Sequence, residues 1–120
     1  MKGIVVLKNR PWLSVLLAVL GYTSITASAA ESSGPRTIDN MGCDNVDTVC
    51  YVYLTGTALG GSLGCASNYV EWDLTDPNGK TSYASLMAAF VAGKQVNIYT
   101  AACFTSRPSF PTLTYFNIYN

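Results

Sequence analysis

Residues 69–99 are YVEWDLTDPNGKTSYASLMAAFVAGKQVNIY, and the spacing of the apolar side chains changes twice within this stretch. The first six residues alternate between apolar and polar, which is typical of a half-buried β-strand. Its apolar face consists of Val70, Trp72 and Leu74. Its other face, which we expect to contact water, consists of Tyr69, Glu71 and Asp73.

A helix is predicted to follow this strand. Large apolar residues recur at helical spacing from Tyr83 to Val91. Asp76 is expected to cap the helix, with Pro77 in its first turn, because proline lacks the N–H group that would have no partner there. Gly93 suits the left-handed conformation that commonly ends a helix. Alanines beside the large apolar residues let such a helix lie close against a sheet.

Strand-forming residues flank this region on both sides. Strands are predicted over residues 49–55, 62–66, 95–102 and 112–119, with a loose segment over 31–40 and a proline-containing loop over 104–111. Three strands, a helix and two strands is the order of an OB-type barrel, a small sheet closed on itself. We therefore expect residues 31–120 to form a single, mainly β domain, a five-stranded OB-like barrel with one helix. An open α+β sheet is the alternative.

The first 30 residues predict an export signal. Lys2, Lys8 and Arg10 precede an apolar stretch, and small residues precede Glu31. The apolar stretch is shorter than the roughly 20 residues that span a bilayer, so we expect cleavage near Ala30. The product would be secreted or periplasmic and would not insert into a membrane. A retained anchor is the alternative.

The charge of the remaining chain excludes several functions. Three of the seven basic residues lie in the signal, which leaves four against seven acids, a net charge of −3. No basic patch is available for nucleic acid, and the absence of histidine excludes Ser–His–Asp and Cys–His catalysis and histidine-ligated zinc. Asp73 and Asp76 are candidates for a catalytic pair or a calcium site, but helix capping and solvation explain them better. We expect no enzyme, no cofactor and no metal.

Four cysteines lie after the signal, and an even number in a small exported chain predicts disulfides. Three pairings are possible. We favour Cys43–Cys50 as a local link and Cys65–Cys103 as a link between the two halves of the domain. The alternative, a zinc site with four thiolates, usually has two close cysteine pairs, and spacings of 7, 15 and 38 residues do not match that pattern.

Tyrosine and asparagine occur in one phase of the predicted strands. If apolar residues such as Phe116 and Ile118 point into the core, then these polar residues, including Asn97, point outward. Tyrosine and asparagine together suit a sugar or a protein partner, because rings stack on apolar surfaces while hydroxyl and amide groups form hydrogen bonds. The alternative is that tyrosine simply favours strands and forms cross-strand pairs. The candidate binding face consists of Tyr51, Tyr53, Tyr69, Tyr99, Tyr115, Asn117 and Tyr119.

Two regions are similar to a known family. The first is CYVYLTG at residues 50–56, followed by Gly61-Ser62, Cys65-Ala66-Ser67 and Trp72, and the second runs from Tyr83 through the helix into GKQVNIY at residues 93–99. They resemble the B subunits of subtilase-cytotoxin-like and typhoid-toxin-like AB5 toxins, and related small exported bacterial proteins. The resemblance implies an OB fold, a homo-pentameric ring and binding of sialylated glycans, although none of the family's sugar-binding positions can be matched here.

We therefore expect a non-enzymatic exported binding module whose ligand is a glycan. The alternative is an interaction or assembly subunit whose ligand is a partner protein.

Overall fold

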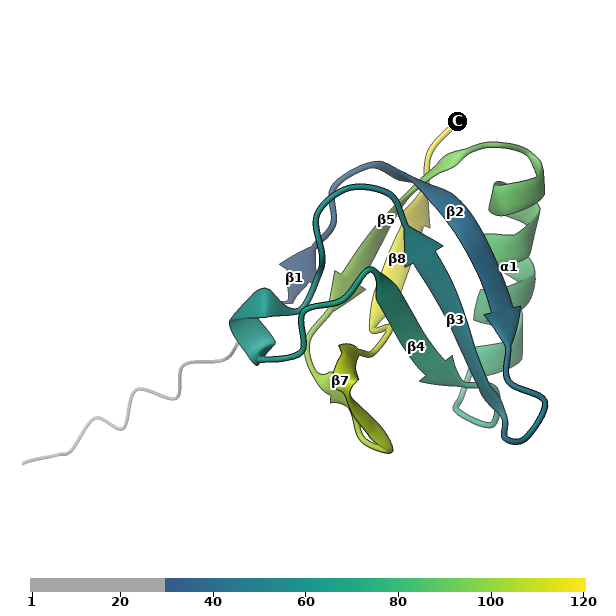
Figure 1. The fold of residues 1–120 in the computed structure, drawn as a ribbon. Coiled ribbons are helices and arrows are strands. Elements are labelled where there is room, and N and C mark those ends of the chain that lie inside the picture. The colour runs from purple at the N-terminus through teal and green to yellow at the C-terminus, as the bar shows by residue number, and fades with distance from the viewer. Residues whose placement is uncertain (1–29) are drawn as a thin grey trace, which may run out of the picture.

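The computed structural model describes residues 30–120, which form a mainly β structure with one α-helix (Figure 1). The predicted export signal lies outside the described residues, apart from Ala30. No helix in the described residues is long and apolar enough to cross a bilayer. The elements are β1 (Glu31–Ser32), β2 (Arg36–Cys43), β3 (Val49–Leu54), the 3-10 helix η1 (Gly61–Leu63), β4 (Tyr69–Asp73), α1 (Gly79–Val91), β5 (Gln95–Thr100), β6 (Cys103–Phe104), β7 (Arg107–Pro111) and β8 (Tyr115–Ile118).

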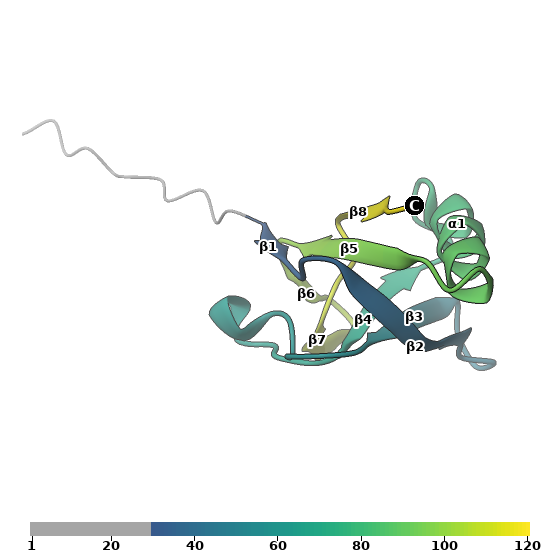
Figure 2. The same ribbon diagram turned by 90° about the horizontal axis from the view of Figure 1, so that it is seen from above.

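Six strands form one sheet in the order β1-β5-β2-β3-β4, with β8 paired to β5, and β6 and β7 form a separate hairpin. All strand pairs are antiparallel. Seen from above, β3 and β4 lie in one layer and β1, β5 and β8 in another, with β2 passing between them and α1 at one end (Figure 2). This bend places the core between two layers of the same sheet.

A closed barrel is not found among residues 30–120. The ladder leaves β4 and β8 as edge strands, and a single parallel bridge between Glu71 and Thr112 joins β4 to the segment before β8. The Leu113 N–H donates a hydrogen bond of 3.0 Å to the Glu71 carbonyl at this place. The expectation of a mainly β fold with one helix is confirmed, whereas the expectation of a closed barrel is not.

The predicted inward faces of β3, β4 and β5 are buried. Val52, Leu54, Val70, Val96 and Ile98 are fully buried and pack in one cluster with Trp72 and Leu86. The prediction is wrong for Ile118, which is 40% exposed, whereas Phe116 is partly buried against the cluster. Ile118 ends the edge strand β8, and no further strand within residues 30–120 covers it.

Tertiary packing moves the start of the helix from the predicted Asp76 and Pro77 to Gly79. Asn78 takes a left-handed conformation (φ 64°) and makes no side-chain cap. Trp72 Nε1 donates to the Gly79 carbonyl at 2.9 Å, and a Cβ on Gly79 would collide with the backbone of Asp73 and Leu74. The end of the helix is as predicted: Gly93 is left-handed, and the N–H groups of Gly93 and Lys94 bond to carbonyls of the last turn.

Three segments differ from the sequence prediction. Residues 31–40, which were expected to be loose, form β1 and most of β2. The alternation of apolar and polar residues along β2 is interrupted by a register irregularity after Ile38. The strand predicted over residues 62–66 is replaced by η1 and a turn, because Gly60 and Gly64 are both left-handed. The loop predicted over 104–111 is mostly β7, and its prolines are tolerated because the hairpin contains only two strands.

Both favoured disulfides are present, and the described residues contain no free cysteine. Cys43 and Cys50 are direct partners on β2 and β3. Cys65 and Cys103 join the turn after η1 to the β6–β7 hairpin. The second bond therefore holds the hairpin, which contributes to the candidate site, against the first half of the domain.

Candidate functional site

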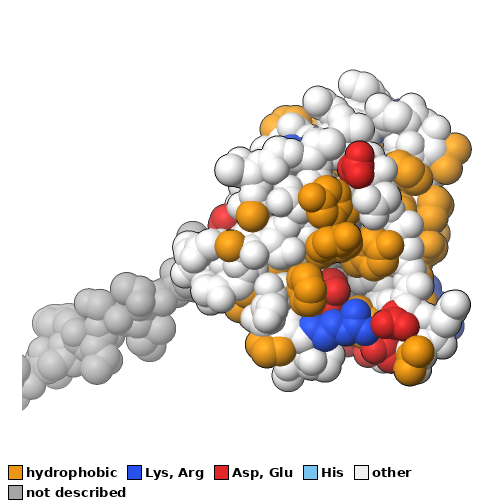
Figure 3. Space-filling view, viewed as in Figure 1, with side chains coloured by type: hydrophobic (Ala, Val, Ile, Leu, Met, Phe, Trp, Pro, Cys, Tyr) orange, Lys and Arg blue, Asp and Glu red, His pale blue; other side chains and the backbone are white. Residues whose placement is uncertain are grey.

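The outer surface of β3 and β4 carries a cluster of four aromatic rings, which we call the aromatic face: Tyr51, Tyr53, Tyr69 and Phe110. Tyr69 lies at its centre, with ring centroids 5.3 Å from Tyr51, 4.7 Å from Tyr53 and 6.1 Å from Phe110, all edge to face. Figure 3 shows apolar side chains gathered over this part of the molecule. Three of the seven predicted candidates are thus brought together, with one ring that the prediction did not include.

Strand register explains this arrangement. Tyr53 is the direct partner of Tyr69, and Tyr51 is the partner of Glu71, so these side chains share one face of the sheet. On the other side of β3, Tyr51 is paired with Gly42. A Cβ on Gly42 would lie 3.2 Å from Tyr51 Oη, so the glycine leaves room for the ring to lie across β2.

The tyrosines of the aromatic face keep groups available for a ligand. Tyr69 is 38% exposed, and Tyr51 and Tyr53 are half-buried. Within residues 30–120, no hydrogen bond engages any of the three hydroxyl groups. The face therefore offers apolar ring surface together with hydroxyl donors and acceptors that the fold does not use.

A group of charged residues borders the aromatic face, and we call it the Arg107 cluster: Arg107, Asp44, Asp47 and Glu71. Arg107 Nη2 lies 2.8 Å from Asp44 Oδ2 and 2.8 Å from Asp47 Oδ2, and Nη1 lies 3.5 Å from Glu71 Oε1. A hydrogen bond from the Val46 N–H, and then the Arg107 guanidinium, hold the pKa of Asp44 below its ordinary value. The hydrogen bond to Asp44 in turn raises the pKa of Arg107.

Glu71 corrects the expectation that this side chain contacts water, because it is only 4% exposed. Arg107 contacts it from the β6–β7 hairpin, in the segment that was expected to be a loop. Burial raises the pKa of Glu71, and the charge and hydrogen bond of Arg107 oppose that rise. Glu71 Oε2 has no hydrogen-bond partner among the described residues.

The other predicted candidates lie on or next to β5 and β8, in the opposite layer (Figure 2). Tyr99 and Tyr115 stack with centroids 4.0 Å apart and an interplanar angle of 13°. Asn97 points away from the core but is only 6% exposed, because Ser32 covers it and its amide donates to Tyr99 Oη at 2.9 Å. Asn117 and Tyr119 are exposed. The predicted candidates therefore form two separate surfaces.

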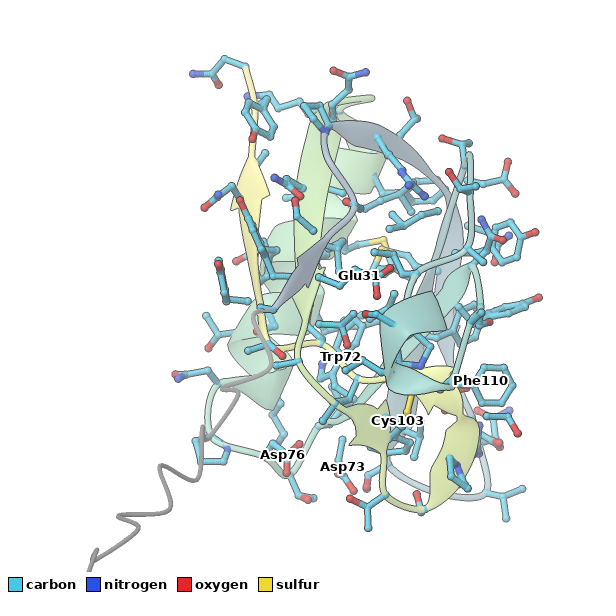
Figure 4. The ribbon with its side chains drawn as sticks, turned by 90° about the vertical axis from the view of Figure 1, so that its left-hand side faces the viewer. Glu31, Trp72, Asp73, Asp76, Cys103 and Phe110 are labelled. Atoms are coloured by element: carbon cyan, nitrogen blue, oxygen red, sulfur yellow. A yellow bond between two sulfur atoms is a disulfide. The ribbon has the colours of Figure 1, made fainter. Side chains whose placement is uncertain are left out.

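Two shallow pockets lie elsewhere, on either side of Asp76. One of about 280 Å³ lies between the start of α1 and the segment that enters β8, and one of about 420 Å³ lies between Asp73 and the β6–β7 hairpin. Figure 4 shows Asp73 and Asp76 at the same end of the domain. Asp73 Oδ1 accepts bonds from Thr48 and Thr75, which lower its pKa and explain it as a turn residue. Within residues 30–120, no group of three or more His, Cys, Asp or Glu side chains is arranged so that it could hold a metal ion.

Sequence reasoning missed Phe110 and Arg107 because both lie in the segment that its prolines predicted to be a loop. One signal could have found them. Cys103, just before this segment, was expected to pair with Cys65, and a segment anchored by a disulfide is held against the domain. Arg107 and Phe110 therefore lie shortly after Cys103, whose disulfide the sequence did predict.

Comparison of the chain with protein-family models, with curated proteins and with solved structures gave no match. The toxin-like resemblance of residues 50–99 therefore stays a prediction. The geometry of the aromatic face and its neighbours is what indicates a function for this protein.

Proposed function

We propose that the protein is an exported, non-enzymatic binding module that holds a glycan on the aromatic face. The observation that carries this proposal is the contact of Tyr51, Tyr53 and Phe110 with the central Tyr69 on one outer surface. A sugar presents an apolar C–H face that packs on aromatic rings, while its hydroxyl groups bond to polar groups at the rim. The unengaged tyrosine hydroxyls are suited to that second role.

The β3–β4 surface supports this function better than the β5–β8 surface. Tyr99 and Tyr115 stack on each other, so each ring already covers one face of its neighbour. The hydroxyl of Tyr99 accepts a hydrogen bond from Asn97. The hydroxyl of Tyr99 is therefore already engaged, whereas all three tyrosine hydroxyls of the aromatic face are without a hydrogen bond in the described residues.

Export and an OB-like barrel belong to the same proposal. Two disulfides fit an oxidising compartment, and we propose that a signal ending near Ala30 directs the chain there. The order β2, β3, β4, α1, β5, β8 is that of an OB fold, which is a partly open barrel. The parallel bridge between Glu71 and Thr112 lies where the last strand of such a barrel would meet the third.

A glycan array with matched variants tests the function. Tyr69→Ala removes the central ring of the aromatic face, and Tyr115→Ala removes a comparably exposed ring from the other surface. We expect the wild-type protein and Tyr115→Ala to bind the same glycans and Tyr69→Ala to lose them, with all three proteins folded by circular dichroism. A wild-type protein that binds no glycan, or loss of binding only in Tyr115→Ala, would contradict the proposal.

A second candidate function, assembly with further copies of the chain, is favoured by the edge strand β8. Tyr115, Ile118 and Tyr119 are 49%, 40% and 39% exposed on or next to this strand, whose outer edge has no strand partner among the described residues. An unpaired, apolar edge is a common site of strand pairing between chains. We expect light scattering to give the mass of a pentamer, and Ile118→Lys to give a monomer. A wild-type monomer at all concentrations would exclude the ring.

A further inference from the structure

The negative charge beside the aromatic face indicates which kind of glycan the face can hold. This inference rests on the proposed function. We propose that the ligand is a glycan that carries free, protonated amino groups, and that the face rejects sugars bearing a carboxylate.

The charged residues are continuous with the aromatic face. Glu71 is the cross-strand partner of Tyr51, and Arg107 precedes Phe110 by three residues on β7. Figure 3 shows basic and acidic surface directly beneath the apolar side chains of this face. A glycan lying across the rings would therefore reach the Arg107 cluster.

The Arg107 cluster has an excess of negative charge. It contains three carboxylates and one guanidinium, which gives a net charge of −2 when all four groups are ionised. Asp44 and Asp47 have side chains that are 37% and 44% exposed, so a ligand can approach them. A ligand ammonium group would neutralise part of this charge, whereas a ligand carboxylate would add to it.

Arg107 is not free to receive an acidic sugar. Its Nη2 already contacts both aspartates and its Nη1 faces Glu71. A ligand carboxylate that binds at Nη2 would have to displace both aspartates and leave their charges unpaired. Two other cations are engaged elsewhere: Arg36 bonds to backbone carbonyls of Ser33 and Thr57, and Lys94 bonds to Asn120.

The two exposed aspartates are held in place for an ammonium ligand. Asp44 Oδ1 accepts the Val46 N–H at 3.0 Å, and Asp47 Oδ1 accepts the Val49 N–H at 2.9 Å. Fixed carboxylates lose little conformational freedom when a cation binds. The neighbouring tyrosine rings add to the attraction, because the face of an aromatic ring attracts an ammonium group.

Calorimetric titration of the purified protein tests the inference with three probes of matched length. These are an oligomer of β-1,4-linked glucosamine, its fully N-acetylated counterpart and a sialylated oligosaccharide, all at a mildly acidic pH that keeps the amines charged. We expect the glucosamine oligomer to bind about two- to fivefold more tightly than the acetylated one, which is the factor that one exposed ion pair typically contributes. Its affinity should fall as salt is added, while that of the acetylated oligomer should change little.

A pair of variants locates the effect. Asp47→Asn should remove most of the preference for the free amine, whereas Asp76→Asn, beside the two pockets, should leave it unchanged. If Asp47→Asn does not fold, the salt dependence of the wild-type protein carries the same test. Equal or tighter binding of the acetylated or sialylated probe would overturn the inference and leave glycan binding intact. Oligolysine serves as a fourth, sugar-free probe. A protein that binds oligolysine but none of the glycans, or that binds none of the probes, would overturn the proposed function as well.

Discussion

Arg107 Nη1 lies 3.5 Å from Glu71 Oε1, and this contact joins the β6–β7 hairpin to a buried carboxyl group on β4. The hairpin is also held by the Cys65–Cys103 disulfide and carries Phe110 to the aromatic face. The position of one ring of the aromatic face therefore depends on an ion pair and a disulfide that lie beside that face.

Replacing Glu71 with glutamine is expected to raise the melting temperature at neutral pH. Burial raises the pKa of Glu71, so its ionised form opposes folding despite Arg107. A group of this kind stabilises the fold fully below its unfolded pKa, about 4.3, and that contribution is lost as the pH rises through the higher folded pKa. The advantage of Glu71→Gln should therefore shrink as the pH falls towards 4.

Thermal melts of both proteins across this pH range measure the difference. Asp44 and Asp73 have lowered pKa values, so their stabilising effect is lost as the pH falls through those folded values, but both proteins contain them. Both groups are ionised in both folded proteins between pH 4 and neutral pH, because their pKa values are lowered from 3.8, so protonation of these groups does not produce the expected difference. A variant less stable than wild type at neutral pH would mean that attraction to Arg107 outweighs the cost of burial.

Cys103→Ala is expected to destabilise the domain in oxidising buffer by about 2–4 kcal/mol, the usual effect of losing a disulfide that closes a long loop. For a domain of this size the melting temperature should fall by roughly 10 °C or more. Under reductant, the variant and the wild type should melt at nearly the same temperature. A difference of equal size in both buffers would assign the loss to packing and not to the bond.

Gly79→Ala is expected to destabilise the fold, because its Cβ would collide with the carbonyl of Asp73 and the backbone of Leu74. Forced overpacking of this kind typically costs about 1–3 kcal/mol. Gly61→Ala is the matched control, since a Cβ there meets nothing within 4 Å. Urea denaturation of the two variants checks the prediction, and equal midpoints would show that β4 and α1 are not packed this closely.

Gly42→Ala is expected to lower the affinity for glycan clearly while lowering the melting temperature only slightly. The new Cβ would lie 3.2 Å from Tyr51 Oη, so the ring must shift by a few tenths of an ångström. We expect affinity to fall several-fold while the melting temperature changes by only a few degrees, because the displaced atom is the end of a surface side chain. Unchanged affinity would place Tyr51 outside the ligand contact.

The fold was predictable where the sequence pattern is strong. Alternation around Val52 and Val70 identified β3 and β4, and the change to helical spacing identified α1. The pattern of β2 is weak because Ile38 is its one fully buried residue before a register irregularity. The start of α1 depends on the approach of Gly79 to β4, which no local propensity encodes.

The candidate site was predictable only in part. The outward phase of Tyr51, Tyr53 and Tyr69 follows from alternation along each strand. Their separation from Tyr99 and Tyr115 does not, because it depends on how the sheet bends between β3 and β5. The burial of Glu71 likewise depends on the hairpin, which contacts β4 from more than thirty residues further along the chain.

A heteronuclear NMR titration of the labelled protein with the glucosamine oligomer shows where on the molecule the ligand binds. We expect shifts of the aromatic signals of Tyr53, Tyr69 and Phe110, and of the backbone amides near Asp44 and Asp47. The signals of Tyr99 and Tyr115 should stay in place and serve as an internal control. Shifts confined to β5 and β8, or no shifts with any of the three glycan probes, would contradict glycan binding at the aromatic face.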